Sequence, residues 1–168
     1  LVVQWDVATE MSILESVYAA TFANPWEVLT ERLVALGDHI PADIELGYHL
    51  CYGSMNNTHW KEPENLEMCK KVSNAISENI SRDIQFIHMP VPIDRSDDSY
   101  FSPLNELSLS PETEIILGLV HGSQNIQQNI ERIEAARVYL NKFGIATECG
   151  LGRRDVSEMP ALMKLQAK

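Results

Sequence analysis

Five short apolar runs alternate along the chain with segments of helical character, and this alternation constrains the fold more than any other feature. The apolar runs span residues 1–6, 44–51, 84–88, 114–120 and 145–149. The segments between them carry helix signals, such as the helix start at Asn24-Pro25. Strands that alternate with helices pair in parallel, because each connection must cross back over the sheet. The sequence therefore predicts an α/β fold with a parallel sheet, either an open doubly wound sheet or a (β/α)₈ barrel.

Every apolar run ends on a side chain that can take part in chemistry. These strand-end residues are Asp6, His49, Cys51, His88, His121, Glu148 and Cys149. The carboxyl ends of parallel strands meet at one edge, and in barrels the active site lies there. His49 and Cys51 are two residues apart in a strand, so their side chains point to the same side. Histidine and cysteine are ligands suited to zinc, so the pattern predicts a site at this edge.

The remaining cysteine and histidines fit structural roles. Cys69 falls on the apolar face of the helix expected after Pro63, where a cysteine behaves as a small hydrophobe. We expect a surface or structural role for His39 and His59, although the loop of His59 lies near the strand ends. The segment 89–112 exceeds an ordinary connection, so we expect it to hold a short helix or to cover the site and contact substrate.

Charge and composition exclude several classes of partner. The chain of 168 residues has a formal charge of −11, which disfavours binding to nucleic acids and to anionic membranes. No apolar run is long enough to span a bilayer, and the first residues do not resemble a secretory signal. Three widely spaced cysteines form no disulfide framework. These features predict a cytoplasmic protein that acts on a small molecule.

Three motifs carry a resemblance to a known family. The runs Tyr48–Tyr52 (Y-H-L-C-Y), Leu119–Gly122 (L-V-H-G) and Glu148–Arg154 (E-C-G-L-G-R-R) resemble motifs of the catalytic domain of cobalamin-independent methionine synthase. There the corresponding runs read H-M-C-Y, D-I-H-S and D-C-G-L-K-T-R. Val3–Asp6 is similar to the I-Q-I-D run of that family, and the order of all four runs agrees. The resemblance covers essentially the whole chain, and corresponds to the second half of the family's domain.

The resemblance implies a fold larger than this chain. The family has a (β/α)₈ barrel of the type shared with uroporphyrinogen decarboxylase, of which this chain would supply about the last five βα units. Residues 1–168 would then be the C-terminal part of a single barrel domain, with about three further units supplied upstream or by another chain. A homo-oligomer is also compatible with such an arrangement.

The resemblance also implies a zinc-dependent methyl or alkyl transfer to a thiol. In the family, zinc binds the substrate thiol, and the thiolate attacks a methyl group on a folate. By resemblance His49, Cys51 and Cys149 are zinc ligands, His121 relays a proton to the leaving group, and Asp6 holds the amino group of homocysteine.

Other residues of the motifs match less directly. Glu148, Arg153 and Arg154 would bind substrate. His88 stands where the family has its fourth zinc ligand, a glutamate, and serves either as that ligand or as a proton carrier. Val7 replaces a second acid that follows the aspartate in the family.

Two alternative functions remain open at this point. The first is a metal-independent acid–base enzyme, a lyase, isomerase or decarboxylase, that uses Asp6, His121 and the arginine pair. The second is a non-catalytic relative that keeps a ligand-binding pocket.

Overall fold

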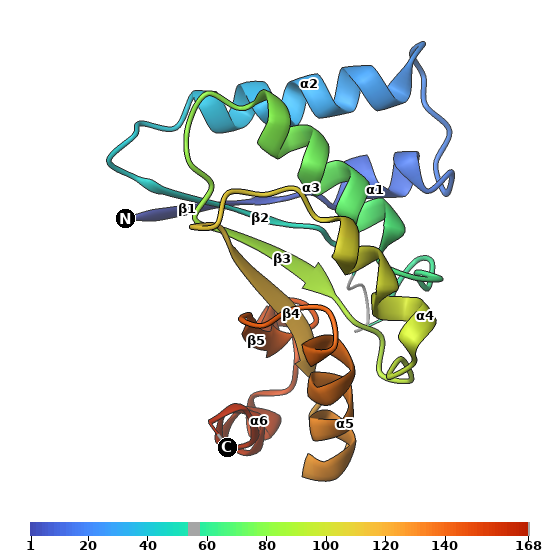
Figure 1. The fold of residues 1–168 in the computed structure, drawn as a ribbon. Coiled ribbons are helices and arrows are strands. Elements are labelled where there is room, and N and C mark those ends of the chain that lie inside the picture. Colours follow the sequence, from blue (N-terminus) through green and yellow to red (C-terminus); the bar gives the residue numbers. More distant parts are fainter. Residues whose placement is uncertain (54–57, 168) are drawn as a thin grey trace.

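The core of the protein is a five-stranded parallel sheet in which neighbours in sequence are neighbours in space (Figure 1). A computed structural model describes residues 1–53 and 58–167. The strands are β1 (Val2–Asp6), β2 (Glu45–His49), β3 (Phe86–Pro90), β4 (Glu114–Val120) and β5 (Gly144–Thr147), in the order β1-β2-β3-β4-β5. All four pairings are parallel, as the alternation of strands and helices predicts.

Helices connect the strands. They are α1 (Ala8–Leu14), α2 (Pro25–Asp38), α3 (Glu67–Asn79), α4 (Asp98–Phe101), α5 (Ile126–Arg137) and α6 (Met159–Gln166). The segment 89–112 holds α4 and the 3₁₀ helix Ser102–Glu106, so the expected short helix is confirmed. Within the described part of the chain, no helix combines the length and the apolar character that crossing a membrane requires.

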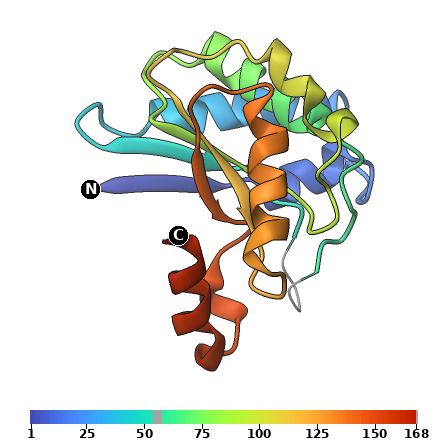
Figure 2. The ribbon, with the colours of Figure 1, turned by 60° about the horizontal axis from the view of Figure 1, so that its bottom comes forward.

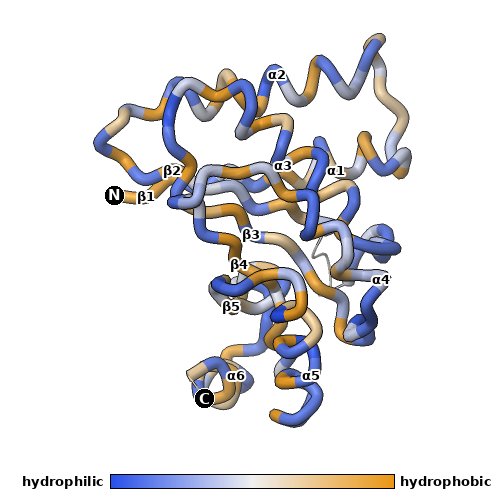
Figure 3. Tube along the Cα trace, in the orientation of Figure 1, coloured by the Kyte–Doolittle hydropathy of each residue, from blue (hydrophilic) through white to orange (hydrophobic). Residues whose placement is uncertain are grey.

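The hydrophobic core lies between the sheet and the helices α2 and α3, which run along one side of it (Figure 1). Strand β4 is mostly hydrophobic (Figure 3), and its Leu117 is fully buried. Tyr48 of β2 donates a hydrogen bond of 2.9 Å to the carbonyl oxygen of Leu33 and so ties α2 to the sheet. Gly37 lies in the last turn of α2, where a Cβ would lie 2.2 Å from the Tyr48 hydroxyl. The glycine therefore permits close packing.

The prediction of a (β/α)₈ barrel is wrong for the described residues. Strand β1 pairs only with β2, and β5 pairs only with β4, so the sheet stays open at both edges. A barrel requires its first and last strands to pair with one another. Figure 2 shows β1, which carries the N-terminus, at the edge of the sheet beside β2. The described chain is a small α/β domain with a single open parallel sheet.

Helix α5 exposes two of its apolar residues and buries polar ones. Ile126 and Ile130 are 40% and 38% exposed. The buried residues of this helix are instead Asn129, Arg132 and Ala136. Hydrogen bonds from the polar side chains among these residues explain their burial, because the bonds satisfy buried backbone groups next to the candidate site.

Candidate functional site

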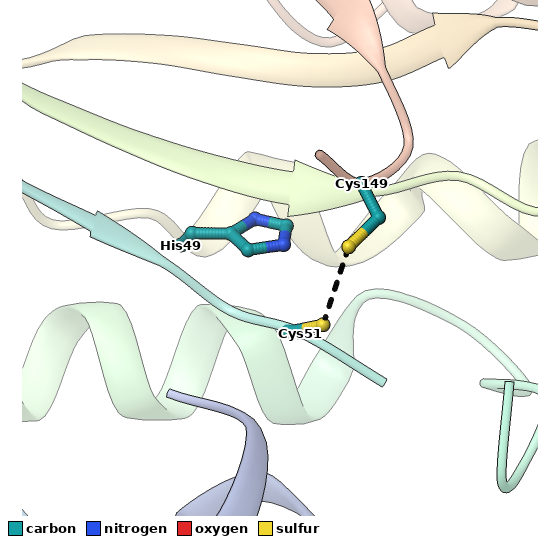
Figure 4. A group of neighbouring side chains, drawn as sticks. All are labelled: His49, Cys51 and Cys149. Atoms are coloured by element: carbon teal, nitrogen blue, oxygen red, sulfur yellow. Dashed lines mark hydrogen bonds between the residues drawn. The ribbon is translucent and has the colours of Figure 1, made fainter. Parts of the chain in front are cut away.

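Three of the predicted ligands come together at the carboxyl edge of the sheet (Figure 4). His49 is the last residue of β2, Cys51 follows two positions later, and Cys149 lies just beyond β5. One ligand atom from each residue lies within 4.8 Å of the others, and the two Sγ atoms are 3.7 Å apart. Segments 98 residues apart in sequence thus converge at one point.

The chemistry of this group fits a metal ion. Both ring nitrogens of His49 are buried without a hydrogen-bond partner among the described residues. Such unsatisfied buried nitrogens cost free energy unless a ligand occupies them. The adjacent Cys149 thiol and burial raise the pKa of Cys51 well above its ordinary value, so Cys51 is protonated at neutral pH. A cation that binds both sulfurs must therefore displace protons.

His88 lies beside this group and not inside it. Register aligns Asp6 with His49 and His49 with His88 across three strands. The rings of His49 and His88 stack with centroids 4.5 Å apart, and the Nε2 of His88 has no hydrogen-bond partner among the described residues. Burial, followed by the neighbouring His49, lowers the pKa of His88 to about 3, which keeps it neutral. Its role as a fourth ligand stays a prediction.

His121 follows β4 and is held in one orientation. Its Nε2 lies 2.8 Å from the carbonyl oxygen of Val91, and because a carbonyl can only accept, Nε2 carries the proton. The Asn129 side chain bonds both the backbone N–H and the carbonyl of His121, at 2.8 Å and 3.3 Å. Burial lowers the pKa of His121 to about 4, with Arg132 and Arg154 adding to this effect. At neutral pH its Nδ1 is therefore an unprotonated acceptor.

We expect His121 to lower the free energy of unfolding as the pH falls. Its pKa is about 4 in the folded protein against an ordinary 6.5, so the unfolded chain binds the proton first. The contribution, on the order of 3 kcal/mol, is complete above pH 6.5 and is lost between about pH 6.5 and 4. Urea unfolding at pH 7 and 4.5 measures the difference, which should be smaller in His121→Asn. Equal differences in the two proteins would contradict this assignment.

A cleft of about 510 Å³ opens at Glu148, the residue before Cys149. His59, Glu62, His121, Glu148 and Arg154 line it, together with residues that follow β3. His59 lies 2.8 Å from Glu62 and 3.2 Å from Glu148. Burial, and then Glu62, raises the pKa of Glu148 to about 9, so Glu148 is a neutral acid at pH 7. The cleft therefore offers proton donors and acceptors as well as a guanidinium group.

His59, for which a surface or structural role was expected, lies on the cleft. Its side chain is 7% exposed because the loop after β2 folds it into the cleft. The spacing of His59 and Glu62, three residues apart, was the available signal.

The segment after β3 divides between the cleft and the core. Pro92, Ile93, Asp94 and Arg95 line the cleft, and their contact with a substrate stays a prediction. Tyr100 and Phe101 are instead fully buried in the core.

Asp6 and Arg153 lie apart from the residues that line the cleft. Asp6 is exposed at the end of the edge strand β1, although its charge acts on the Cys51 thiol. Arg153 is also exposed. Of the two arginines, only Arg154 lines the cleft.

Comparison with known proteins identifies a similar fold. No protein-family model matches the sequence, and no curated protein matches it. Among solved structures, the chain is similar to the "putative vitamin-B12 independent methionine synthase from Listeria monocytogenes", with a TM-score of 0.59 and 18% identity. At this identity the likeness is one of fold. The match covers 98% of this chain and 45% of that protein, so the chain spans less than half of its length.

Proposed function

We propose that the protein holds a zinc ion with His49, Cys51 and Cys149 and transfers a methyl or alkyl group to a thiol. The convergence of one imidazole and two thiols within 4.8 Å carries this proposal. Two sulfur ligands and one nitrogen ligand suit zinc, and a site with three protein ligands leaves room for a substrate. The fold likeness to a methionine synthase and the motifs shared with that family support the same chemistry.

Zinc, when bound, would lower the pKa of a coordinated thiol and keep it as a thiolate at neutral pH. The residues of the chain then have separate roles. His49, Cys51 and Cys149 hold the ion, and His88 is the candidate fourth ligand.

His121 faces the cleft with an unprotonated Nδ1, which can accept the thiol proton and return it to the leaving group. The bond from sulfur to carbon forms, the bond from carbon to the donor breaks, and the proton ends on the donor. A folate is the methyl donor that the family resemblance implies.

Metal uptake and thiol methylation test this proposal together. Reduced, metal-free protein should bind one zinc ion per chain and then methylate a small thiol from a methylated folate. Elemental analysis measures the metal, and mass spectrometry measures the thioether. A chelator should stop the reaction and added zinc should restore it. Protein with reduced thiols that takes up no zinc at micromolar concentration would refute the proposal.

The cleft itself favours a second candidate, an acid–base enzyme. Glu148 is a neutral acid and His121 is an unprotonated base on the same cleft, which is the pairing that proton transfer requires. A lyase or isomerase of this kind would keep its activity in the presence of a chelator, whereas the transferase would lose it.

A further inference from the structure

The wall of the cleft near His121 is positively charged. Arg154 lines the cleft with a side chain that is 23% exposed. Its guanidinium lies 3.7 Å from Glu158, whose side chain is 58% exposed. An ion pair this loose and this exposed contributes little, so Arg154 can bind a ligand without breaking a strong contact.

A second cation lies behind this wall. Arg132 is buried, and its guanidinium donates to the carbonyl oxygens of Leu119 and Ile93, at 3.0 Å and 2.8 Å. Its other hydrogen bonds go to the side-chain oxygens of Gln124 and Asn129. These four partners are neutral, so the charge of Arg132 is not cancelled by a paired carboxylate among them. A buried charge of this kind acts strongly on its surroundings, because little water screens it.

Two acidic side chains of the cleft share His59 as a close partner, and the charges of Arg132 and Arg154 also act on one of them, Glu148. Glu62 and Glu148 both lie against His59, at 2.8 Å and 3.2 Å. Arg95, also on the cleft, pairs with Asp97 at 2.9 Å. Arg154 is therefore the cleft cation best placed to receive an anionic group from a ligand.

We infer that Arg154 binds the acid group of the substrate, and that the substrate is a small mercapto acid recognised without its amino group. This inference rests on the proposed function. Glu148 and Arg154 line the cleft, Cys149 is the residue after Glu148, and Cys149 and Arg154 both act electrostatically on Glu148, so the substrate we infer carries an acid group for Arg154 and a sulfur for the group of His49, Cys51 and Cys149. Asp6, the carboxylate that the resemblance assigns to an amino group, is exposed and outside the cleft-lining residues, and Val7 replaces the acid beside it.

Three thiols of equal length test which groups of the substrate the protein recognises. 4-Mercaptobutanoate has the thiol and the acid, homocysteine adds the amino group, and 4-mercaptobutanamide replaces the acid by a neutral amide. Calorimetry on zinc-loaded protein should give similar dissociation constants for the first two thiols. The amide should bind at least about tenfold more weakly than the acid. Equal binding of acid and amide, or binding of homocysteine alone, would overturn the inference and leave the proposed function standing.

Arg154→Met should remove the preference for the acid over the amide, and Arg154→Lys should restore part of it. Arg137→Met is the matched control, because it removes the same charge from an exposed site on α5 and should keep the preference. Circular dichroism and thermal unfolding establish that each variant folds. An equal loss of preference in the Arg154 and Arg137 variants would show a general charge effect and overturn the inference.

Butanoate, which has no thiol, separates the two proposals. If no thiol binds but butanoate binds metal-free protein in an Arg154-dependent way, the acid site stands and the thiol-transfer function falls. If neither a thiol nor butanoate binds, both proposals fall.

Discussion

Replacing Cys149 by serine is expected to remove bound zinc and thiol methylation together. The serine hydroxyl stays protonated at neutral pH and is a poor ligand, so only His49 and Cys51 of the close group would remain. We expect zinc affinity to fall by at least about a hundredfold, because loss of a ligand exceeds the 10–100-fold effects of supporting residues. Competition with a chromogenic chelator measures the affinity of each variant.

Two further variants control this experiment. Cys69→Ala removes a thiol that is fully buried in α3, away from the metal group, and should keep zinc and activity. His88→Gln should weaken zinc binding less than Cys149→Ser, because His88 lies beside the close group of ligand atoms. Full zinc affinity in Cys149→Ser, or the same loss in Cys69→Ala, would contradict the assignment.

Replacing Arg132 by methionine is expected to destabilise the whole domain. The buried guanidinium satisfies two backbone carbonyls and two side-chain oxygens, from Leu119, Ile93, Gln124 and Asn129. Methionine fills similar space but leaves these acceptors buried without donors, at about 1–3 kcal/mol for each acceptor that water does not reach. We expect the free energy of unfolding to fall by about 3 kcal/mol or more, as measured by urea denaturation.

Arg137→Met tests whether this loss comes from the buried network. Arg137 is on the same helix, but its side chain is 61% exposed and its ion pair with Glu134 is at the surface. Its replacement should change the free energy of unfolding by less than about 0.5 kcal/mol. A loss for Arg132→Met no larger than that of the control would show that water replaces the network.

The close group of His49, Cys51 and Cys149 was predictable because each of its components is a local pattern. The H-x-C spacing in a strand directs His49 and Cys51 to one side. The carboxyl ends of β2 and β5 lie at the same edge of the parallel sheet. The predicted convergence of His49, Cys51 and Cys149 is confirmed. The assignment of His88 as fourth ligand stays a prediction, as do the roles of Asp6, Glu148 and Arg153.

The cleft was less predictable, because its residues come from loops whose paths depend on long-range contacts. For His59, which enters the cleft from the loop after β2, the sequence offered only its spacing to Glu62 as a signal. In α5, Ile126 and Ile130 are exposed, whereas Arg132 is buried. A buried arginine becomes favourable only when distant carbonyl oxygens, such as that of Ile93, are in place to accept its hydrogen bonds.

By itself, the sequence determined the five strands, their parallel pairing and the residues at their carboxyl ends. Alternation of apolar runs with helices decides these features locally, and β4 spans Glu114–Val120 as expected. Only the tertiary structure decided that the described sheet stays open, that Arg154 and not Arg153 lines the cleft, and that His121 presents Nδ1. Each of these depends on which distant groups meet, since edge pairing, loop placement and the tautomer of a histidine are set by partners far away in the chain.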